Sequence, residues 1–98
     1  MATSKNDKEY ILERLTILDG ITCRPMMGEY LLYYQNVLFG GIYEGRVLVK
    51  QVDGNLKYDL PEVIPYQNAK PMYFISDLDH EELTKEIILD TYRSLLKK

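Results

Sequence analysis

The sequence contains one cysteine and one histidine, two residue types that together can form a nucleophile and its base. A cysteine nucleophile needs a nearby base and a lowered thiol pKa. His80 stands at the start of an expected helix, where the helix dipole disfavours the protonated imidazole. Nothing in the spacing of Cys23 and His80 favours a catalytic pair. We therefore predict that the protein has no catalytic residues and is not an enzyme.

Acidic side chains gather around the start of the same expected helix, at Asp77, Asp79, Glu81 and Glu82. They lack the ligand spacing and central glycine of an EF-hand loop, and one cysteine with one histidine cannot complete a structural zinc site. Negative charge in the first turn of a helix is favourable, which explains the group without a ligand. The sequence also lacks a P-loop, a dinucleotide fingerprint and a nucleophile elbow. We predict neither a metal site nor a cofactor.

Arg24 is the strongest candidate for binding an anion, because a guanidinium grips a carboxylate or phosphate through two parallel hydrogen bonds. A structural interpretation competes with this one. In it, Arg24 pairs with Glu29 or Asp19 and holds the first turn of the sheet to the preceding helix.

Met26 and Met27 follow, and methionine-rich surfaces adapt well to protein partners. The competing interpretation is strand alternation, which sends one of the two side chains into the core and the other outward.

Nine tyrosines raise the question of base stacking on single-stranded nucleic acid. Their neighbours Glu29, Glu44 and Asp59 are acidic, however, and the chain has a formal net charge of −3 with scattered positive residues. Binding to phosphates needs a concentrated basic surface. We therefore expect no direct binding to nucleic acid, and interpret the tyrosines as half-buried strand residues.

The elements that must position these residues begin with a helix from Ser4, capped by Ser4 or Asn6. Its apolar side chains recur at spacings of three and four, at Ile11, Leu12, Leu15 and Leu18. Asp19 and Gly20 end the run, and glycine can take the left-handed conformation that closes a helix.

Strand-length apolar segments alternate with turn residues over the next part of the chain. This pattern predicts an antiparallel meander of four strands at residues 21–27, 30–34, 37–43 and 46–52, with turns at residues 28–29, 35–36 and 44–45. Pro25 lacks a backbone donor, so the first strand should lie at a sheet edge or be interrupted. Gly40 and Gly41 inside the third strand indicate a bulge, a bend or the close approach of another backbone.

The remaining residues predict a loop or short helix at 55–70, a fifth strand at 71–76 and a C-terminal helix capped by Asp77 or Asp79. The whole is an α+β fold whose helices pack on one face of the sheet. A length of 98 residues fits one domain, residues 1–98. With a lone cysteine, no apolar leader and no membrane-spanning run, we expect a cytoplasmic protein.

The segment from Arg24 onward resembles the N-terminal domain of the TfoX (Sxy) competence regulators. The matching residues run in the family's order: Arg24, Met26, Met27 and Gly28, then Tyr30 and Tyr33, Phe39, the turn Glu44-Gly45, and the strand Val47-Leu48-Val49-Lys50. Order and spacing agree over residues 9–50. Met27 stands where that family commonly has an aromatic residue, and Glu29 where it commonly has glycine. The resemblance implies an α+β architecture like that of the secretion chaperones, and cytosolic regulators that act through protein partners such as the catabolite activator.

We therefore expect a noncatalytic regulatory or protein-interaction module, with a transcription regulator as its implied partner. Its candidate interaction or ligand site comprises Arg24, Met26, Met27, Gly28, Glu29 and Tyr30. Pairing of edge strands would give a homodimer. The alternative is a small-molecule sensor or enzyme with a pocket between sheet and helices, lined by tyrosines and Arg24.

Overall fold

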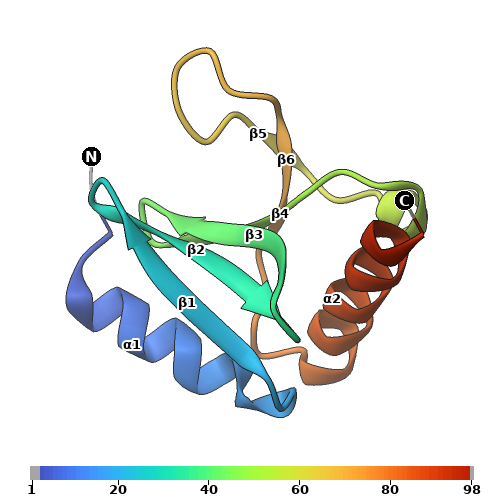
Figure 1. The fold of residues 1–98 in the computed structure, drawn as a ribbon, viewed down its shortest axis with the longest axis horizontal. Helices are drawn as coiled ribbons and strands as arrows, with labels where there is room; N and C mark the ends of the chain where they lie inside the picture. The colour runs from blue at the N-terminus through green and yellow to red at the C-terminus, as the bar shows by residue number, and fades with distance from the viewer. Residues whose placement is uncertain (1–2, 98) are drawn as a thin grey trace.

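The structure, a computed structural model, describes residues 3–97 as a sheet flanked by two helices (Figure 1). In chain order the elements are α1 (Lys5–Arg14), the 3-10 turn η1 (Leu15–Ile17), β1 (Ile21–Met26), β2 (Glu29–Tyr34), β3 (Val37–Tyr43), β4 (Arg46–Val49), the 3-10 helix η2 (Asp53–Tyr58), β5 (Glu62–Val63), β6 (Met72–Ile75) and α2 (Glu81–Leu96). The strands form one antiparallel sheet in the order β1-β2-β3-β4-β6-β5. This confirms the α+β class, the four-stranded meander and the edge position of β1.

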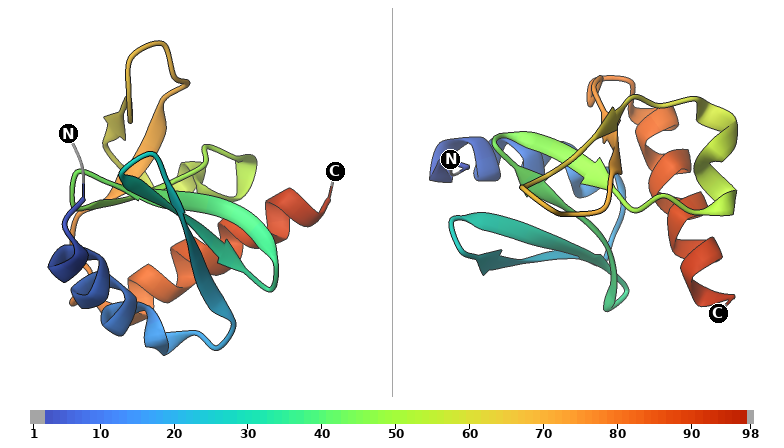
Figure 2. Two further views of the ribbon diagram at one scale, coloured as in Figure 1. Left: turned by 60° about the vertical axis from the view of Figure 1, so that its left-hand side comes forward. Right: turned by 90° about the horizontal axis from the view of Figure 1, so that it is seen from above.

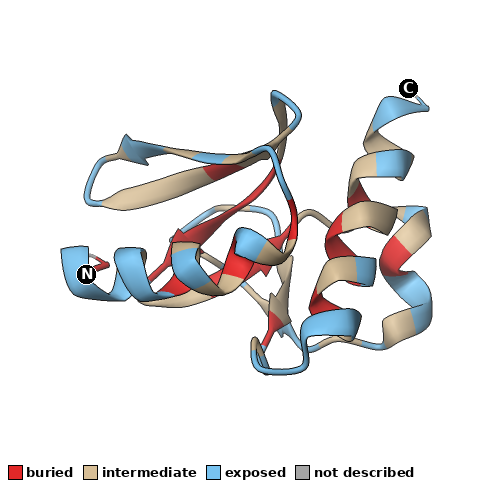
Figure 3. Cartoon of the chain, turned by 90° about the horizontal axis from the view of Figure 1, so that it is seen from below, coloured by how far each residue is buried: buried red, intermediate tan, exposed pale blue. Residues whose placement is uncertain are grey.

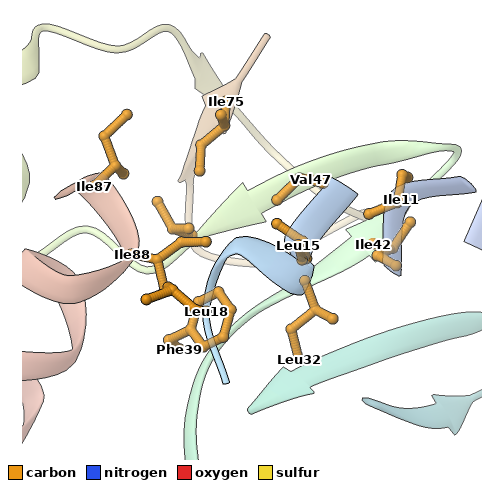
Figure 4. Packing of buried hydrophobic residues seen from close by; sticks show 11 residues of the cluster. Ile11, Leu15, Leu18, Leu32, Phe39, Ile42, Val47, Ile75, Ile87 and Ile88 are labelled. Atoms are coloured by element: carbon orange, nitrogen blue, oxygen red, sulfur yellow. The ribbon is translucent and has the colours of Figure 1, made fainter. Parts of the chain in front are cut away.

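Both helices cover the same face of the sheet, and their apolar sides meet the strands in one cluster (Figure 4). The buried members are Ile11, Leu15, Leu18, Leu32, Phe39, Ile42, Val47, Val49, Ile75, Ile87 and Ile88. The α1 helix begins at the predicted cap, where the Ser4 hydroxyl oxygen accepts a hydrogen bond of 3.0 Å from the backbone N–H of Asp7. Away from the sheet α1 is largely exposed, whereas most of α2 is half-buried or buried (Figure 3).

The sheet differs from the prediction at its far edge. It has six strands rather than five, because the short strand β5 lies within the predicted loop and pairs with β6. The fourth strand ends at Val49 instead of residue 52. The side chain of Asn55 explains this, since its Oδ1 accepts from the backbone N–H of Val52 at 3.2 Å and its Nδ2 donates to the carbonyl of Lys50 at 2.8 Å. These backbone groups are therefore no longer available to extend the ladder.

The first hairpin turn is Met27-Gly28, one residue earlier than the predicted turn at residues 28–29. The φ angles of Met27 and Gly28 are +50° and +87°. A two-residue hairpin connection of this kind needs positive φ at both positions. The register then pairs Met26 directly with Glu29, so β1 ends at Met26.

The C-terminal helix is capped by His80 rather than by Asp77 or Asp79. The Nδ1 atom of His80 accepts a hydrogen bond of 3.2 Å from the backbone N–H of Leu83. Asp77 closes the turn before the helix, because its carboxylate accepts from the backbone N–H of Asp79 at 3.1 Å. The predicted helix is therefore present, with a different residue at its start.

The predicted irregularity in β3 is a bulge. Tyr33 of β2 pairs with Leu38, whereas the preceding Leu32 pairs with Gly40, so Phe39 is an extra residue in β3. A bulge bends a strand and increases its local twist. The side chain of Phe39 is fully buried in the core.

A buried polar network joins η2 to α2. Asn55 is fully buried, and its Nδ2 also donates to the Thr91 hydroxyl at 2.8 Å. Beside it, the backbone N–H of Gly54 donates to the Ser94 hydroxyl at 2.9 Å. Within residues 3–97, every buried side-chain nitrogen and oxygen has a hydrogen-bond partner. The connection that leaves β4 is thus fixed to the last helix by side-chain chemistry.

A second polar contact reinforces this junction on its exposed side. The Tyr58 hydroxyl donates to the Asp90 carboxylate, which also pairs with Lys57 at 3.1 Å and Arg93 at 3.2 Å. The hydrogen bond from Tyr58, followed by the charge of Lys57, lowers the pKa of Asp90 below its ordinary value. Burial, and then the bond to Asp90, raises the pKa of Tyr58.

Replacing the buried amide tests the first network. We expect Asn55→Ala to lower the free energy of unfolding by about 3 kcal/mol, because it leaves buried backbone groups without partners. Urea unfolding followed by circular dichroism measures this. Asn6→Ala, at an exposed position of α1, should change the value by less than about 0.5 kcal/mol. Equal losses in the two variants would contradict the role of Asn55.

The second contact predicts a pH dependence. Because folding lowers the pKa of Asp90, its ionised form stabilises the protein above the ordinary aspartate pKa of about 3.9, and this contribution is lost as pH falls through the lower folded-state value. Asp90→Asn should therefore cost about 1.5 kcal/mol near neutral pH, with a smaller difference from wild type at about pH 3. Asp19→Asn, at an exposed position, serves as the control in the same urea titrations. A difference that stays constant between the two pH values would refute the assignment.

Candidate interaction cleft

The face of the sheet away from α1 and α2, called here the outer face, also carries apolar side chains. One row of cross-strand partners shows its make-up, because residues directly opposite each other point to the same side. This row runs from β1 to β6 through Arg24, Leu31, Gly41, Leu48 and Phe74. Leu48 is fully buried although it lies outside the core cluster beneath the helices. The sheet therefore buries apolar surface on both sides.

A cleft of about 620 Å³ lies on the outer face, under the connection between β5 and β6. This connection projects away from the body of the molecule (Figure 1, Figure 2). The apolar lining includes Met26, Leu31, Leu38, Met72 and Leu95. A neighbouring hollow of about 580 Å³ shares Met26, Tyr43, Pro65 and Tyr66 with it and continues to Met27, Glu29, Glu44 and Gln67. We call the continuous depression the outer cleft.

Tyr43 forms the floor where the two hollows join. Its side chain folds back over Gly41, since a Cβ atom on that glycine would lie 2.6 Å from Cε2 of the ring. The Tyr43 ring also stands 6.1 Å from the ring of Tyr66 across the cleft, at an angle of 44°. Burial raises the pKa of the Tyr43 phenol, with smaller contributions from Tyr66 and Glu29. Tyr43 is thus a fixed, neutral surface for an apolar group.

Exposed apolar side chains stand at the rim of the outer cleft. Met27, at the tip of the first hairpin, is 98% exposed, and Tyr66 on the opposite lip is 57% exposed. Two of the six large hydrophobic residues that the described chain exposes therefore line this one cleft. Clustering of this kind marks interaction surfaces more often than scattered exposure does.

The two ends of the outer cleft differ in charge. Lys50 and Lys70 are the charged side chains in the lining of the larger hollow. The smaller hollow is lined by Glu29 and Glu44, which already have partners. The Glu29 carboxylate accepts from the hydroxyl of Thr3 and from the backbone N–H of Glu44.

Thr3 ties the start of the chain to both hairpin tips at this end. Its backbone N–H donates to the carbonyl of Gly28 at 3.0 Å, and its hydroxyl oxygen accepts from the backbone N–H of Gly45 at 3.0 Å. Thr3 is itself buried. The tips of the β1–β2 and β3–β4 hairpins, and with them Met27 and Glu29, are therefore held at a fixed separation.

The residues that the sequence singles out divide between two faces. Met26, Met27 and Glu29 all line the outer cleft, and Gly28 forms the turn between them. Tyr30 points to the opposite face, where its ring packs against the core cluster and the Lys8 ammonium lies 5.3 Å from the ring centroid.

Arg24 lies exposed on the outer face, with its guanidinium carbon 5.6 Å from the centroid of the Tyr33 ring. Within residues 3–97 it forms an ion pair with neither Glu29 nor Asp19, so the predicted structural pairing is wrong. Arg24 is also absent from the described lining of the outer cleft.

Sequence reasoning missed most of the lining. Leu31 and Leu38 follow from alternation, but alternation alone does not tell which face the helices cover. Tyr43 and Tyr66 lie far apart in sequence and meet only because the connection after β5 folds back over the sheet. The sequence does indicate that Tyr66 lies in a loop, because it directly follows Pro65 in a segment rich in turn residues.

The catalytic and metal candidates remain separate from this cleft. Cys23 lines a smaller cleft of about 350 Å³ between the first helix and β1, whose lining among the described residues includes neither a tyrosine nor Arg24. His80 uses Nδ1 to cap α2. Among residues 3–97, no group of three or more His, Cys, Asp or Glu side chains could hold a metal ion.

Within the same described range, no helix has both the length and the apolar character needed to cross a membrane. Comparison of the chain with family models, with curated proteins and with solved structures finds no match.

Proposed function

We propose that the protein is a noncatalytic interaction module that binds a segment of a partner protein in the outer cleft. The observation that carries this proposal is the presence of exposed Met27 and Tyr66 on opposite sides of a cleft with an apolar floor. Such a surface resembles the core of a protein interface, in which aromatic residues and methionine are enriched.

The cleft combines a floor on paired strands with a rim on a loop, an arrangement suited to a peptide. Tyr43, Leu31 and Leu38 belong to paired strands, so their positions are set by the sheet. Tyr66 belongs to the long connection between β5 and β6. An extended segment of a partner could lie along the floor while rim side chains close over it, as happens in grooves that recognise peptides.

The likeness to the TfoX N-terminal domain adds a biological setting to the proposal. In that setting the module regulates competence or transcription in the cytoplasm through a protein partner. Met26, Met27 and Gly28, which contribute to the likeness, are at one end of the outer cleft, so the same segment supports both parts of the proposal. Self-pairing of the edge strand β1 is a separate prediction that light scattering at several concentrations would test.

A second candidate is a sensor for a small molecule. The larger hollow has a volume of about 620 Å³, which falls within the usual range for ligand pockets. This candidate predicts a rise in melting temperature with a specific compound in a metabolite screen, since a ligand that binds only the folded state stabilises it. A flat screen would remove its main support. The exposed rim favours the protein partner, because it offers surface beyond what a small ligand would cover.

A peptide selection tests the first candidate without knowledge of the partner. We expect a random peptide library to yield binders of the full chain, and Tyr66→Ala to weaken them about tenfold, the usual effect of removing an interface aromatic. Tyr10→Ala is the matched control, because Tyr10 is similarly exposed, at 51%, on α1. Fluorescence anisotropy gives the affinities, and equal melting temperatures show that both variants fold. Selected peptides that bind the two variants equally would place the interaction elsewhere.

A further inference from the structure

We infer that the segment bound by the outer cleft is acidic and apolar, with an Asp or Glu side chain next to a large apolar residue. This inference rests on the proposed function and specifies the chemistry of the partner. Its basis is the juxtaposition of two lysines with apolar walls at the larger end of the cleft.

Lys50 and Lys70 are the charged side chains that line this end, and acidic residues are absent from its lining within residues 3–97. The chain as a whole carries a formal net charge of −3, so a hollow whose charged side chains are both positive departs from the average surface. Neither lysine forms an ion pair with a described residue. A carboxylate on the partner is the group that complements them.

The backbone holds Lys50 in place for this role. Its N–H donates to the carbonyl of Phe39 at 2.9 Å, and its carbonyl accepts from Asn55 Nδ2 at 2.8 Å. The preceding residue, Val49, points into the core, so alternation directs Lys50 to the outer face. The base of this side chain is fixed even though its ammonium group can adapt to a ligand.

Apolar surface surrounds the two lysines. Leu38, Val52, Met72 and Leu95 line the same hollow. A carboxylate that reaches the ammonium groups must therefore be accompanied by an apolar neighbour, or it would leave these walls facing water. This favours an acidic peptide with interspersed large apolar side chains over an oligonucleotide, whose phosphates repeat without such side chains.

Three labelled decapeptides of the same apolar pattern test the inference on the full chain. In the first, aspartate alternates with phenylalanine and leucine; asparagine replaces aspartate in the second, and lysine replaces it in the third. We expect the aspartate peptide to bind at least about threefold more tightly than the asparagine peptide, and the lysine peptide to bind most weakly. Only the aspartate peptide should lose affinity as salt is raised from low to physiological ionic strength.

Variants assign the effect to the two lysines. The double variant K50M/K70M should bind the aspartate peptide about three- to tenfold more weakly and the asparagine peptide unchanged, since each exposed charge pair contributes modestly. The double variant K50R/K70R should retain the preference. Lys5→Met, at an exposed position of α1, is the control and should have no effect.

The outcomes separate this inference from the proposed function. If all three peptides bind with equal affinity and Tyr66→Ala weakens each of them, the cleft is an interaction surface and the acidic preference is wrong. If a single-stranded oligothymidylate binds more tightly than the aspartate peptide, the inference is wrong. Failure of the aspartate peptide to bind also overturns it, and the random library then decides independently whether the cleft binds any peptide.

Discussion

The close approach of β3 to β4 at Gly40 is the constraint on which much of the structure depends. A Cβ atom there would lie 2.1 Å from the carbonyl oxygen of Leu48, a distance that a rigid backbone cannot accommodate. The same place holds the bulge that adds Phe39 to β3. Because β3 is an inner strand of the sheet, this local geometry affects both faces. It sends Phe39 into the helix-covered core and leaves Leu38 on the outer face.

The contacts of Asn55 after β4 fix the path of the chain where it leaves the sheet. The buried amide of Asn55 bonds to the backbone on one side and to Thr91 of α2 on the other. One side chain thus ends a strand, shapes η2 and docks the last helix. The same contacts hold the backbone of Lys50, so the core network and the basic end of the outer cleft share a support.

Much of the sheet could be predicted from the sequence because its signals are local. Alternation in β2 and the turns at residues 35–36 and 44–45 depend on neighbouring residues, and all appear as predicted. The end of β4 could not be predicted this way. It depends on the bonds of Asn55 to Val52 and Lys50, and the same buried amide also bonds Thr91, 36 positions away, which no local pattern indicates. The turn at Met27 was displaced for another reason, since a non-glycine residue accepts positive φ there to keep the register of β1 with β2.

The candidate site was predicted in part. The end of the outer cleft near the first hairpin could be predicted, because Met26 and Met27 are neighbours in sequence at the end of β1 and in the turn. The opposite lip was hidden because Tyr66 reaches Tyr43 only through the long return of the chain between β5 and β6. Tyr30 illustrates the reverse error: it is adjacent in sequence to the site, yet alternation turns its ring to the helices.

The exposure of the rim has a consequence for how this protein can change over evolutionary time. Tyr66 contributes little to the core, so substitutions there leave the free energy of folding nearly unaltered. Met27 is also exposed to solvent, but its turn position accepts only residues that tolerate a positive φ. The floor residue Tyr43 lacks this freedom, since it is buried against Gly41. Under the function proposed above, the rim can therefore change to suit another partner while the floor is preserved. Under that proposal, affinity for a new partner and stability of the fold can be selected almost independently.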